Sequence, residues 1–291
     1  MLAARQFAII LWKDVLIDLR RKENLVAMLL FSLLILMLFN FSFGGRDDVR
    51  YRLTRHAVQR LAEQGLPAEA AKALRALGDR TFPQRRAFLD ALSQVGDAVP
   101  PAWRPRILAA AERTFVQAIA PGLLWVTFLL AGVLGLDKSF NQEKENAALE
   151  GLLLAPLPRG ILYLGKLGGN VLFLAVLLAL LLPVYALLFN VALWDVAAPL
   201  AAVMLGGVLG FAALGTLLGG ITSRLRGKEV LLPLLLFPLT APVLIVVVRL
   251  TDVLLTTGAL TGQQGWINLL AAFDVVFLTV SYLVFDYIME A

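Results

Sequence analysis

Residues 160–167, GILYLGKL, have the spacing G-x-x-x-x-G-K of a phosphate-binding loop. In such a loop, backbone N–H groups surround phosphates and a following Ser or Thr hydroxyl holds Mg²⁺. Here Leu167 replaces that hydroxyl, and Pro156 and Pro158 precede the stretch where a strand is required. The sequence therefore predicts no nucleotide site at this position. Lys166 is instead expected to extend its charged end back to the lipid headgroups.

Other reactive groups are scarce. The chain has no cysteine, which excludes disulfides, thiolate catalysis and cysteine metal sites. His56 is the single histidine, and because metal sites need three or four converging ligands, we expect it to be a surface residue. Haem ligation lacks both a second histidine and an attachment motif, and no G-x-S-x-G nucleophile motif occurs. The sequence predicts neither catalytic residues nor a metal or cofactor site in this chain.

Two ionisable residues lie within or beside apolar segments, where charge usually has a function or a partner. Asp274 is placed deep in the last apolar segment and Arg249 borders the one before it, so we hypothesise that they form an ion pair. The glycine-rich stretch 206–220 favours close helix packing. Proline removes a backbone donor and kinks a helix. One apolar segment has three prolines and is a candidate hinge or broken helix: Pro233, Pro238 and Pro242.

The composition indicates a membrane protein. Of the 291 residues, 59% are hydrophobic and only 16% are charged, whereas soluble domains are about 45–50% apolar. A helix needs roughly 20 apolar residues to span a bilayer. Six segments qualify: 25–43, 115–136, 161–189, 196–221, 230–248 and 266–285. They are apolar on all sides, so they indicate an all-α, polytopic protein with six transmembrane helices rather than a barrel.

Basic residues predict the orientation of the spans. Five Lys or Arg precede the first span, four lie between the second and third when Lys166 at the start of the third is included, and three lie between the fourth and fifth. Cytoplasmic loops carry this excess, so both termini are expected in the cytoplasm. The net charge of +5 is explained in the same way, without a nucleic-acid partner. Residues 1–24 place apolar side chains at helical spacing between charges, which predicts an amphipathic helix in the membrane interface.

The loop between the first two spans differs from the others. Residues 44–113 hold 13 Lys or Arg against 8 Asp or Glu, but long loops cross largely regardless of charge. We therefore expect 46–113 to be a small outer insertion within a six-span domain covering 25–291. Helical patterns follow Pro67 and Pro83, and further prolines interrupt the chain before the second span. The prediction is two or three short helices.

The connector between the second and third spans has a recognisable pattern. Leucines at positions i, i+3 and i+4 form one apolar face beside several glutamates, and prolines then end it. This predicts a short amphipathic helix on the cytoplasmic surface, either resting on headgroups or gripped by a partner. The candidate coupling residues are Glu143, Glu145, Leu149, Glu150, Leu152, Leu153, Pro156, Pro158 and Arg159.

This connector resembles that of ABC-exporter permeases. The shared pattern is L-E-x-L-L-x-x-P-L-x-R followed by G-K, from Leu149 to Lys166. The surrounding segments AALEGLLLAPLPRGILYLGK, RLRGKEVLLPLLLFPLTAPVLI and IAPGLLWVTFLLAGVLGL are similar to the heme exporter protein B (CcmB) family. The similarity covers nearly the whole chain outside 46–113, where the family usually has a much shorter loop.

The resemblance implies a non-catalytic permease subunit in a prokaryotic inner membrane. A cytoplasmic ABC ATPase would dock on the connector, and its cycle would release haem-loaded chaperone outside for c-type cytochromes. The implied partners are that ATPase, a haem-handling membrane subunit, a small membrane subunit and a second copy of this chain. Haem and ATP would be handled by the partners, with no cofactor bound directly. The alternatives are an ABC exporter permease for a lipid, glycan or drug, and a membrane scaffold independent of any ATPase.

Overall fold

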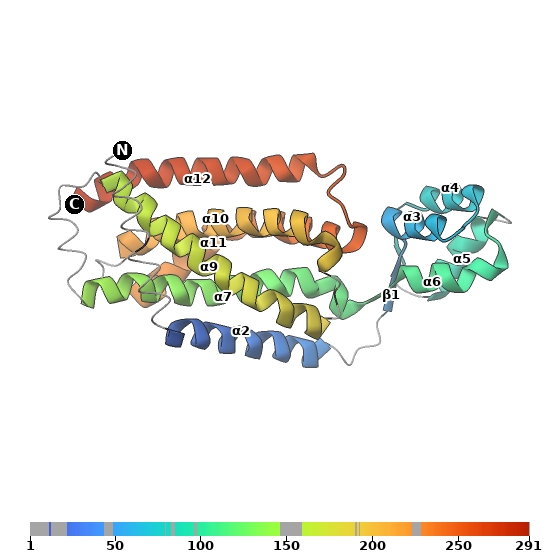
Figure 1. Ribbon diagram of the computed structural model, residues 1–291, viewed down its shortest axis with the longest axis horizontal. Helices are drawn as coiled ribbons and strands as arrows, with labels where there is room; N and C mark the ends of the chain where they lie inside the picture. The colour runs from blue at the N-terminus through green and yellow to red at the C-terminus, as the bar shows by residue number, and fades with distance from the viewer. Residues whose placement is uncertain are drawn as a thin grey trace.

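The protein is described from a computed structural model. It describes residues 12, 22–43, 49–78, 80–82, 85–95, 98–145, 159–189, 191, 193–222 and 228–290. Within them, a bundle of long helices forms one body, and a smaller unit of short helices and strands stands at one end of it (Figure 1).

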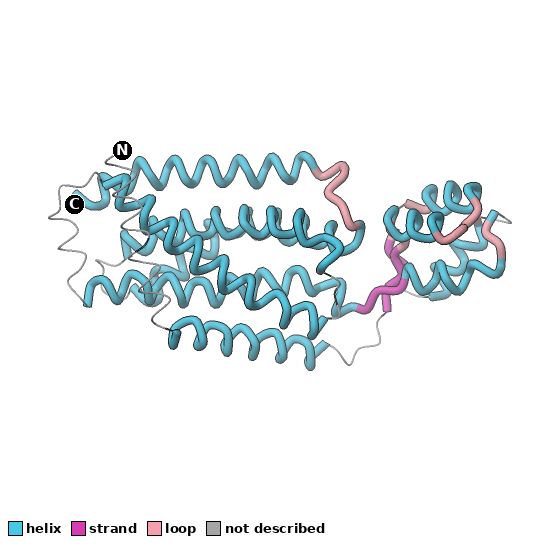
Figure 2. Tube along the Cα trace, in the orientation of Figure 1, coloured by secondary structure: helices cyan, strands magenta, loops and turns pink. Residues whose placement is uncertain are grey.

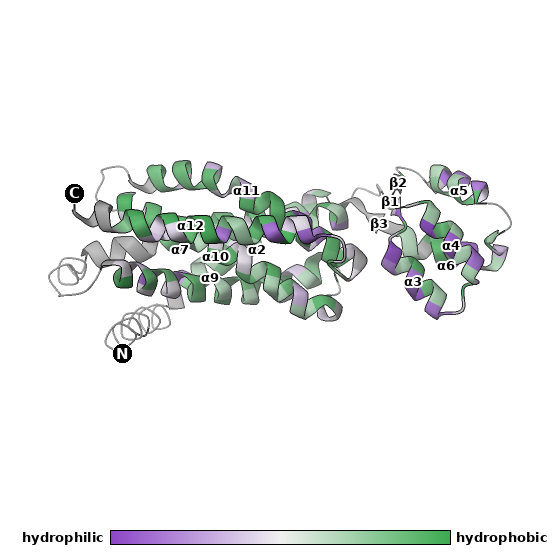
Figure 3. Ribbon diagram, turned by 90° about the horizontal axis from the view of Figure 1, so that it is seen from above, coloured by the Kyte–Doolittle hydropathy of each residue, from purple (hydrophilic) through white to green (hydrophobic). Residues whose placement is uncertain are grey.

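Six long apolar helices make up the bundle, as predicted. They are α2 (Lys22–Phe43), α7 (Phe115–Glu145), α9 (Arg159–Phe189), α10 (Ala197–Thr222), α11 (Lys228–Thr257) and α12 (Gln264–Glu290). Hydrophobic residues dominate their outer surfaces, whereas hydrophilic residues gather on the smaller unit (Figure 3). This is the surface that lipid requires, because a bilayer offers no water to solvate polar groups.

Helix α10 is the centre of the bundle. It packs against α7, α9, α11 and α12. Of the residues in its most apolar 18-residue stretch, 72% are buried. Its glycines allow this crowding, as the sequence predicted. A Cβ added at Gly207 would lie 2.7 Å from Trp125 Cζ3, and one at Gly210 would lie 2.6 Å from an Asp274 oxygen. In contrast, only 22% of the residues in the most apolar stretch of α2 and 17% of those in the most apolar stretch of α12 are buried.

Two helices extend further than the apolar segments indicated. Helix α7 continues through charged residues to Glu145, and α11 continues past Val248 to Thr257. The extra turns of α11 contain Arg249 and Asp252, which contact each other at i, i+3. Helix α9 is one uninterrupted element of 31 residues, with Pro183 inside it.

The insertion between α2 and α7 has its own hydrophobic core, which includes Leu61, Leu74, Phe88 and Ile107. Its helices are α3 (Arg55–Glu63), α4 (Ala68–Ala76), α5 (Arg85–Gln94), the short 3-10 helix η2 (Pro101–Trp103) and α6 (Arg104–Ala111). Helices α4 and α5 are the two that the sequence predicted. The described part of the insertion holds four α-helices rather than two or three, and α3 and α6 were missed. Pro105 occupies the first turn of α6, where the absent N–H costs nothing.

A three-stranded antiparallel sheet was also not predicted. Its order is β2–β1–β3, from β2 (Thr81–Phe82), β1 (Val49–Arg52) and β3 (Glu112–Thr114). Val49 pairs with Thr114, so the chain enters and leaves the insertion side by side. These strands lie between the bundle and the helices of the insertion (Figure 2). Because β3 runs directly into α7, the insertion joins the bundle through a paired stem rather than two loose linkers.

The first residue of α2 and the last turn of α12 lie at the end of the bundle opposite the insertion (Figure 1). The insertion end also carries the turn between α9 and α10, with the 3-10 helix η3 (Trp194–Val196). Apart from Trp12 and residues 22–24, the predicted interfacial helix 1–24 lies outside the described residues. Which end faces the cytoplasm stays a prediction from the basic residues.

Candidate functional site

Three of the predicted coupling residues lie in described helices, at the end of the bundle away from the insertion (Figure 1). Glu143 and Glu145 belong to the last turn of α7, and Arg159 is the first residue of α9. The remaining six fall outside the described residues: Leu149, Glu150, Leu152, Leu153, Pro156 and Pro158. Their role as a docking surface stays a prediction, but the structure shows what receives the chain when it leaves the connector.

That receiving helix, α9, is tied to α10 by buried polar contacts. The Tyr163 hydroxyl donates to the Ala213 carbonyl at 3.3 Å, and Asn170 Nδ2 donates to Thr216 Oγ1 at 2.9 Å. The Ser281 hydroxyl of α12 reaches the same Ala213 carbonyl at 3.5 Å. In a membrane such contacts contribute about 0.6 kcal/mol each on average. They fix the relative positions of three helices near the connector.

Lys166 lies on the same part of α9 and is only 5% exposed. The expectation that it extends to the headgroups is therefore wrong. Its position, three residues after Tyr163 and four before Asn170, places it on the helix face that packs into the bundle. A burial this deep depends on the rotation of α9, which the apolar sequence around Lys166 does not encode.

The predicted ion pair between Arg249 and Asp274 is not formed. Asp274 is 8% exposed and packs on α10, where Gly206 and Gly210 leave room for its carboxyl group. Arg249 instead lies 3.9 Å from Asp252 on its own helix. The helices of the two residues turn them toward different neighbours.

The three prolines of α11 do not break it. Pro233, Pro238 and Pro242 all lie inside a helix that runs from Lys228 to Thr257. The Thr240 hydroxyl, between the last two, donates to the Leu236 carbonyl at 2.8 Å, as hydroxyls commonly do in irregular membrane helices. The broken-helix alternative is therefore wrong, while the hinge stays a prediction.

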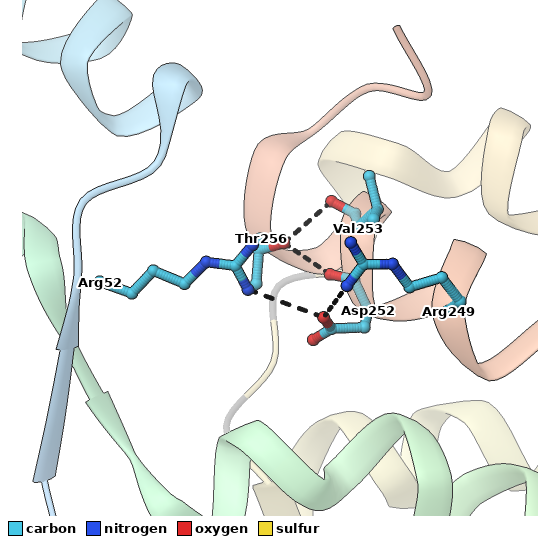
Figure 4. A network of polar contacts seen from close by, with 5 residues as sticks. All are labelled: Arg52, Arg249, Asp252, Val253 and Thr256. Atoms are coloured by element: carbon cyan, nitrogen blue, oxygen red, sulfur yellow. Dashed lines mark hydrogen bonds and ion pairs between the residues drawn. The ribbon is translucent and has the colours of Figure 1, made fainter. Parts of the chain in front are cut away.

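A charged cluster joins the insertion to the bundle at the other end (Figure 4). Arg52 of β1 lies 3.8 Å from Asp252 of α11, and Arg249 approaches the same carboxylate. The Thr256 hydroxyl donates to the Asp252 backbone carbonyl at 2.6 Å, which adds a contact within the last turn of α11. The sequence offered no sign of this cluster, because Arg52 and Asp252 are 200 positions apart.

His56 forms a second contact beside this cluster. It is half-buried, and a Cβ at Gly258 would lie 3.0 Å from its Nε2. Gly258 has a φ of +74° in the turn after α11, a conformation that favours glycine. His56 was expected to be a surface residue; it packs instead on the helix end to which Arg52 also binds.

Helices α7 and α11 are held together between these two ends. Trp125 Nε1 donates to Thr251 Oγ1 at 3.0 Å, and the Trp125 ring packs edge-on against Phe128. Among the described residues, no group of three or more His, Asp or Glu side chains could hold a metal ion. The prediction that haem and ATP belong to partner subunits remains a prediction.

Six long apolar helices, one of which is buried at the centre of the bundle, define a multi-pass α-helical membrane protein. Residues 109–289, nearly the whole bundle after α2, match the family described as CcmB protein. The chain belongs to this family. The match does not include residues 1–108, which contain α2 and most of the insertion, so the insertion as an addition to the family's shared part stays a prediction.

Three similar proteins are each named heme exporter protein B. The one from Pseudomonas aeruginosa is 34% identical over 134 residues, 46% of this chain and 60% of that protein. The one from Haemophilus influenzae is 32% identical over 168 residues, 57% of this chain and 73% of that protein. The one from Paracoccus denitrificans is 38% identical over 131 residues, 45% of this chain and 59% of that protein. The chain thus matches about three fifths of the length of the first and third relatives.

Proposed function

We propose that this protein is the membrane permease subunit of an ABC transporter that handles haem during c-type cytochrome biogenesis. The observation that carries the proposal is the family match across residues 109–289, which contains the connector and five of the six spans. The name shared by the three relatives supports haem as the cargo of the complex. A cytoplasmic ATPase would supply the energy, and this subunit would transmit it.

The contacts of α9 suggest how transmission works. A partner that grips the connector pulls on α9 through Arg159, its first residue. Tyr163 and Asn170 pass that displacement to α10 through the hydrogen bonds to Ala213 and Thr216. Because α10 packs against four of the bundle's helices, it cannot shift without displacing them.

In this proposal the movement reaches the outer side at the end of the bundle that contacts the insertion. Helix α11, which packs along α10, carries Asp252 near its C-terminal end, and Arg52 of the insertion contacts the Asp252 carboxylate. A movement of α11 would therefore move the insertion on the outer side. In this proposal the connector receives the input, the spans transmit it, and the outer surface releases haem-loaded chaperone. The subunit itself carries out no reaction.

The proposal also covers location and partners. Both termini lie in the cytoplasm, as the basic residues predict. The spans cross the inner membrane of a prokaryote, as the family resemblance implies. The partners are a cytoplasmic ABC ATPase, a haem-handling membrane subunit and a small membrane subunit. A second copy of this chain is expected, because six spans would make half of a transporter.

Affinity purification of the complex from mild detergent tests the proposal. The bound subunits are identified, and an absorbance spectrum reports haem. The double variant Glu150→Lys with Leu153→Glu should lose the ATPase, because it reverses the charge and removes the apolar contact of the predicted docking helix. The matched control is Glu69→Lys with Ala76→Glu, two exposed positions on the insertion, and it should retain the ATPase.

Two results would contradict separate parts of the proposal. If the Glu150 and Leu153 variant retains the ATPase as fully as the control, the connector is not its docking surface. If the wild-type complex contains an ATPase but neither haem nor cytochrome-maturation subunits, the cargo is different. A purified chain with no ATPase under any mild condition would favour the scaffold alternative.

A further inference from the structure

A groove opens on the lipid-facing side of the bundle between α7 and α11. Its volume is about 570 Å³, within the range of roughly 300–1,000 Å³ typical of small-ligand sites. Gly122 forms part of the α7 wall, and Leu244, Ile245 and Val248 form much of the α11 wall. No atom lies within 4 Å of the position that a Gly122 Cβ would take, so the groove exists partly because that side chain is absent.

The groove changes character along its length. Its apolar wall on α11 ends at Arg249 and Asp252, which also line it. The candidate span of α11 ends at Thr256, so Asp252 lies about 6 Å and Ile245 about 16 Å from that end at 1.5 Å per residue. A leaflet of a 30 Å hydrocarbon core is about 15 Å deep. Charge therefore lies near the interface, and the apolar wall reaches the middle of the bilayer.

Among the described residues, the charged end has two guanidinium groups on one carboxylate. Arg52 and Arg249 both approach the single carboxylate of Asp252, at 3.8 and 3.9 Å. At 3.9 Å the Arg249 guanidinium is beyond hydrogen-bond distance, and its side chain is 46% exposed. Its planar set of donors is suited to a phosphate group. Figure 4 shows the two guanidinium groups converging on Asp252 from β1 and from α11.

We propose that this groove binds an anionic phospholipid, with its phosphate on Arg249 and an acyl chain along Leu244, Ile245 and Val248. Such a lipid has its charge at the interface and its apolar chains toward the middle of the bilayer. The groove has Arg249 and its apolar wall at the same two depths. A soluble phosphate would leave the apolar wall empty, and an uncharged chain would leave Arg249 and Arg52 with the Asp252 carboxylate alone. The site is separate from the connector and does not depend on the proposed role in haem handling.

Native mass spectrometry of the purified full chain in detergent tests this. The probes are phosphatidylglycerol, which is anionic, and phosphatidylcholine, which has no net charge, with identical acyl chains. One positive charge near a membrane surface changes binding of an anionic lipid about fivefold. The wild-type protein should therefore retain phosphatidylglycerol about fivefold better. Glycerophosphoglycerol, the same headgroup without chains, should not compete.

Two variants with matched controls locate the site. Arg249→Gln should abolish the preference for phosphatidylglycerol, whereas Arg104→Gln, at an exposed residue of the insertion, should keep it. Gly122→Leu should fill the groove and lower retention of both lipids several-fold. Val126→Leu adds a methylene one turn further along α7, at a position 44% exposed outside the groove, and should have no effect. Leucine favours helix over glycine, so Gly122→Leu is expected to fold.

Three outcomes would overturn the proposal. The first is equal retention of both lipids by the wild-type protein. The second is full retention by Gly122→Leu, which would place bound lipid elsewhere. The third is competition by glycerophosphoglycerol at the same concentration, which would assign the site to soluble phosphates. A groove that retains no lipid and is covered only when partner subunits are present would be a protein interface, and that result also rejects a lipid site.

Discussion

Gly207 offers the sharpest test of how closely α10 packs in the bundle. In Gly207→Ala the new Cβ would lie 2.7 Å from Trp125 Cζ3 and 2.9 Å from Val247 Cγ1. Trp125 is 1% exposed and Val247 is 0% exposed, so neither can swing into lipid. Trp125 is further held by its hydrogen bond to Thr251. The substitution must therefore displace a fixed side chain or separate two helices.

The net effect follows from three terms. Overpacking a well-filled core typically costs about 1–3 kcal/mol. Breaking the hydrogen bond from Trp125 would add about 0.6 kcal/mol. Replacing a helical glycine by alanine stabilises the helix by about 1 kcal/mol, which offsets part of these costs. Gly207→Ala should thus destabilise the protein by about 0.5–2.5 kcal/mol.

Reversible unfolding in mixed micelles with increasing SDS, followed by far-ultraviolet circular dichroism, measures this free energy. Gly122→Ala is the matched control, because nothing lies within 4 Å of its Cβ position. It should stabilise the protein by about 0.5–1 kcal/mol. Trp125→Phe removes the ring atoms that the new methyl group meets, so it should partly rescue Gly207→Ala in a double-mutant cycle.

The reasoning is refuted if Gly207→Ala raises stability as much as Gly122→Ala does. In that case the methyl group at position 207 meets no resistance, and α10 is not packed as closely as described. A destabilised Gly207→Ala with no coupling to Trp125 would place the strain on Val247 instead.

Three further predictions concern other contacts of the bundle. A double-mutant cycle with Asn170→Leu and Thr216→Val should give a coupling free energy of about 0.6–1.7 kcal/mol in SDS unfolding, and a value near zero would mean that the hydrogen bond is not formed. Amine acetylation of the folded protein, read by peptide mass spectrometry, should modify the exposed Lys72 and spare Lys166, which is 5% exposed; equal modification would contradict the burial. Gly258→Ala should cost about 1–2 kcal/mol in the same unfolding assay, because φ is +74° at this position, and unchanged stability would show that the turn can relax.

The transmembrane helices could be predicted because the signal for them is local. A bilayer selects for length and hydrophobicity, and each span carries both in one continuous segment. Helices α4 and α5 were also predictable, since their apolar residues recur at helical spacing. Helix ends were less certain: α11 runs past Val248 because Arg249 and Asp252 are tolerated in contact with each other and with Arg52.

The sheet of the insertion illustrates what local patterns miss. Its strands are short: VRYR alternates between apolar and polar residues over only four positions, and ERT has no apolar residue. Strand β1 gains its stability by pairing with β3, about 60 residues later, and with β2. Only a folded insertion brings them together.

For the candidate site, too, some features could be predicted from the sequence and others could not. The residue types and spacing of the connector pointed to the permease family, and that family is confirmed by the match over 109–289. The partner of Arg249 could not be predicted correctly, because depth in the membrane follows from sequence position but direction follows from helix rotation. Asp274 turns toward the space left by Gly206 and Gly210, and Arg249 turns toward Asp252.

By itself, then, the sequence determined the number of spans, the membrane as solvent and the family, since hydropathy and motif spacing are properties of the chain. The tertiary structure alone decided that Lys166 is buried, that His56 packs on Gly258 and that two arginines share Asp252. The physical reason is that Arg52 and Asp252, and His56 and Gly258, are far apart in the chain and meet only when the insertion docks on the end of α11. Lys166 is buried because of how α9 is rotated, and a helix that is apolar on all sides does not encode its rotation.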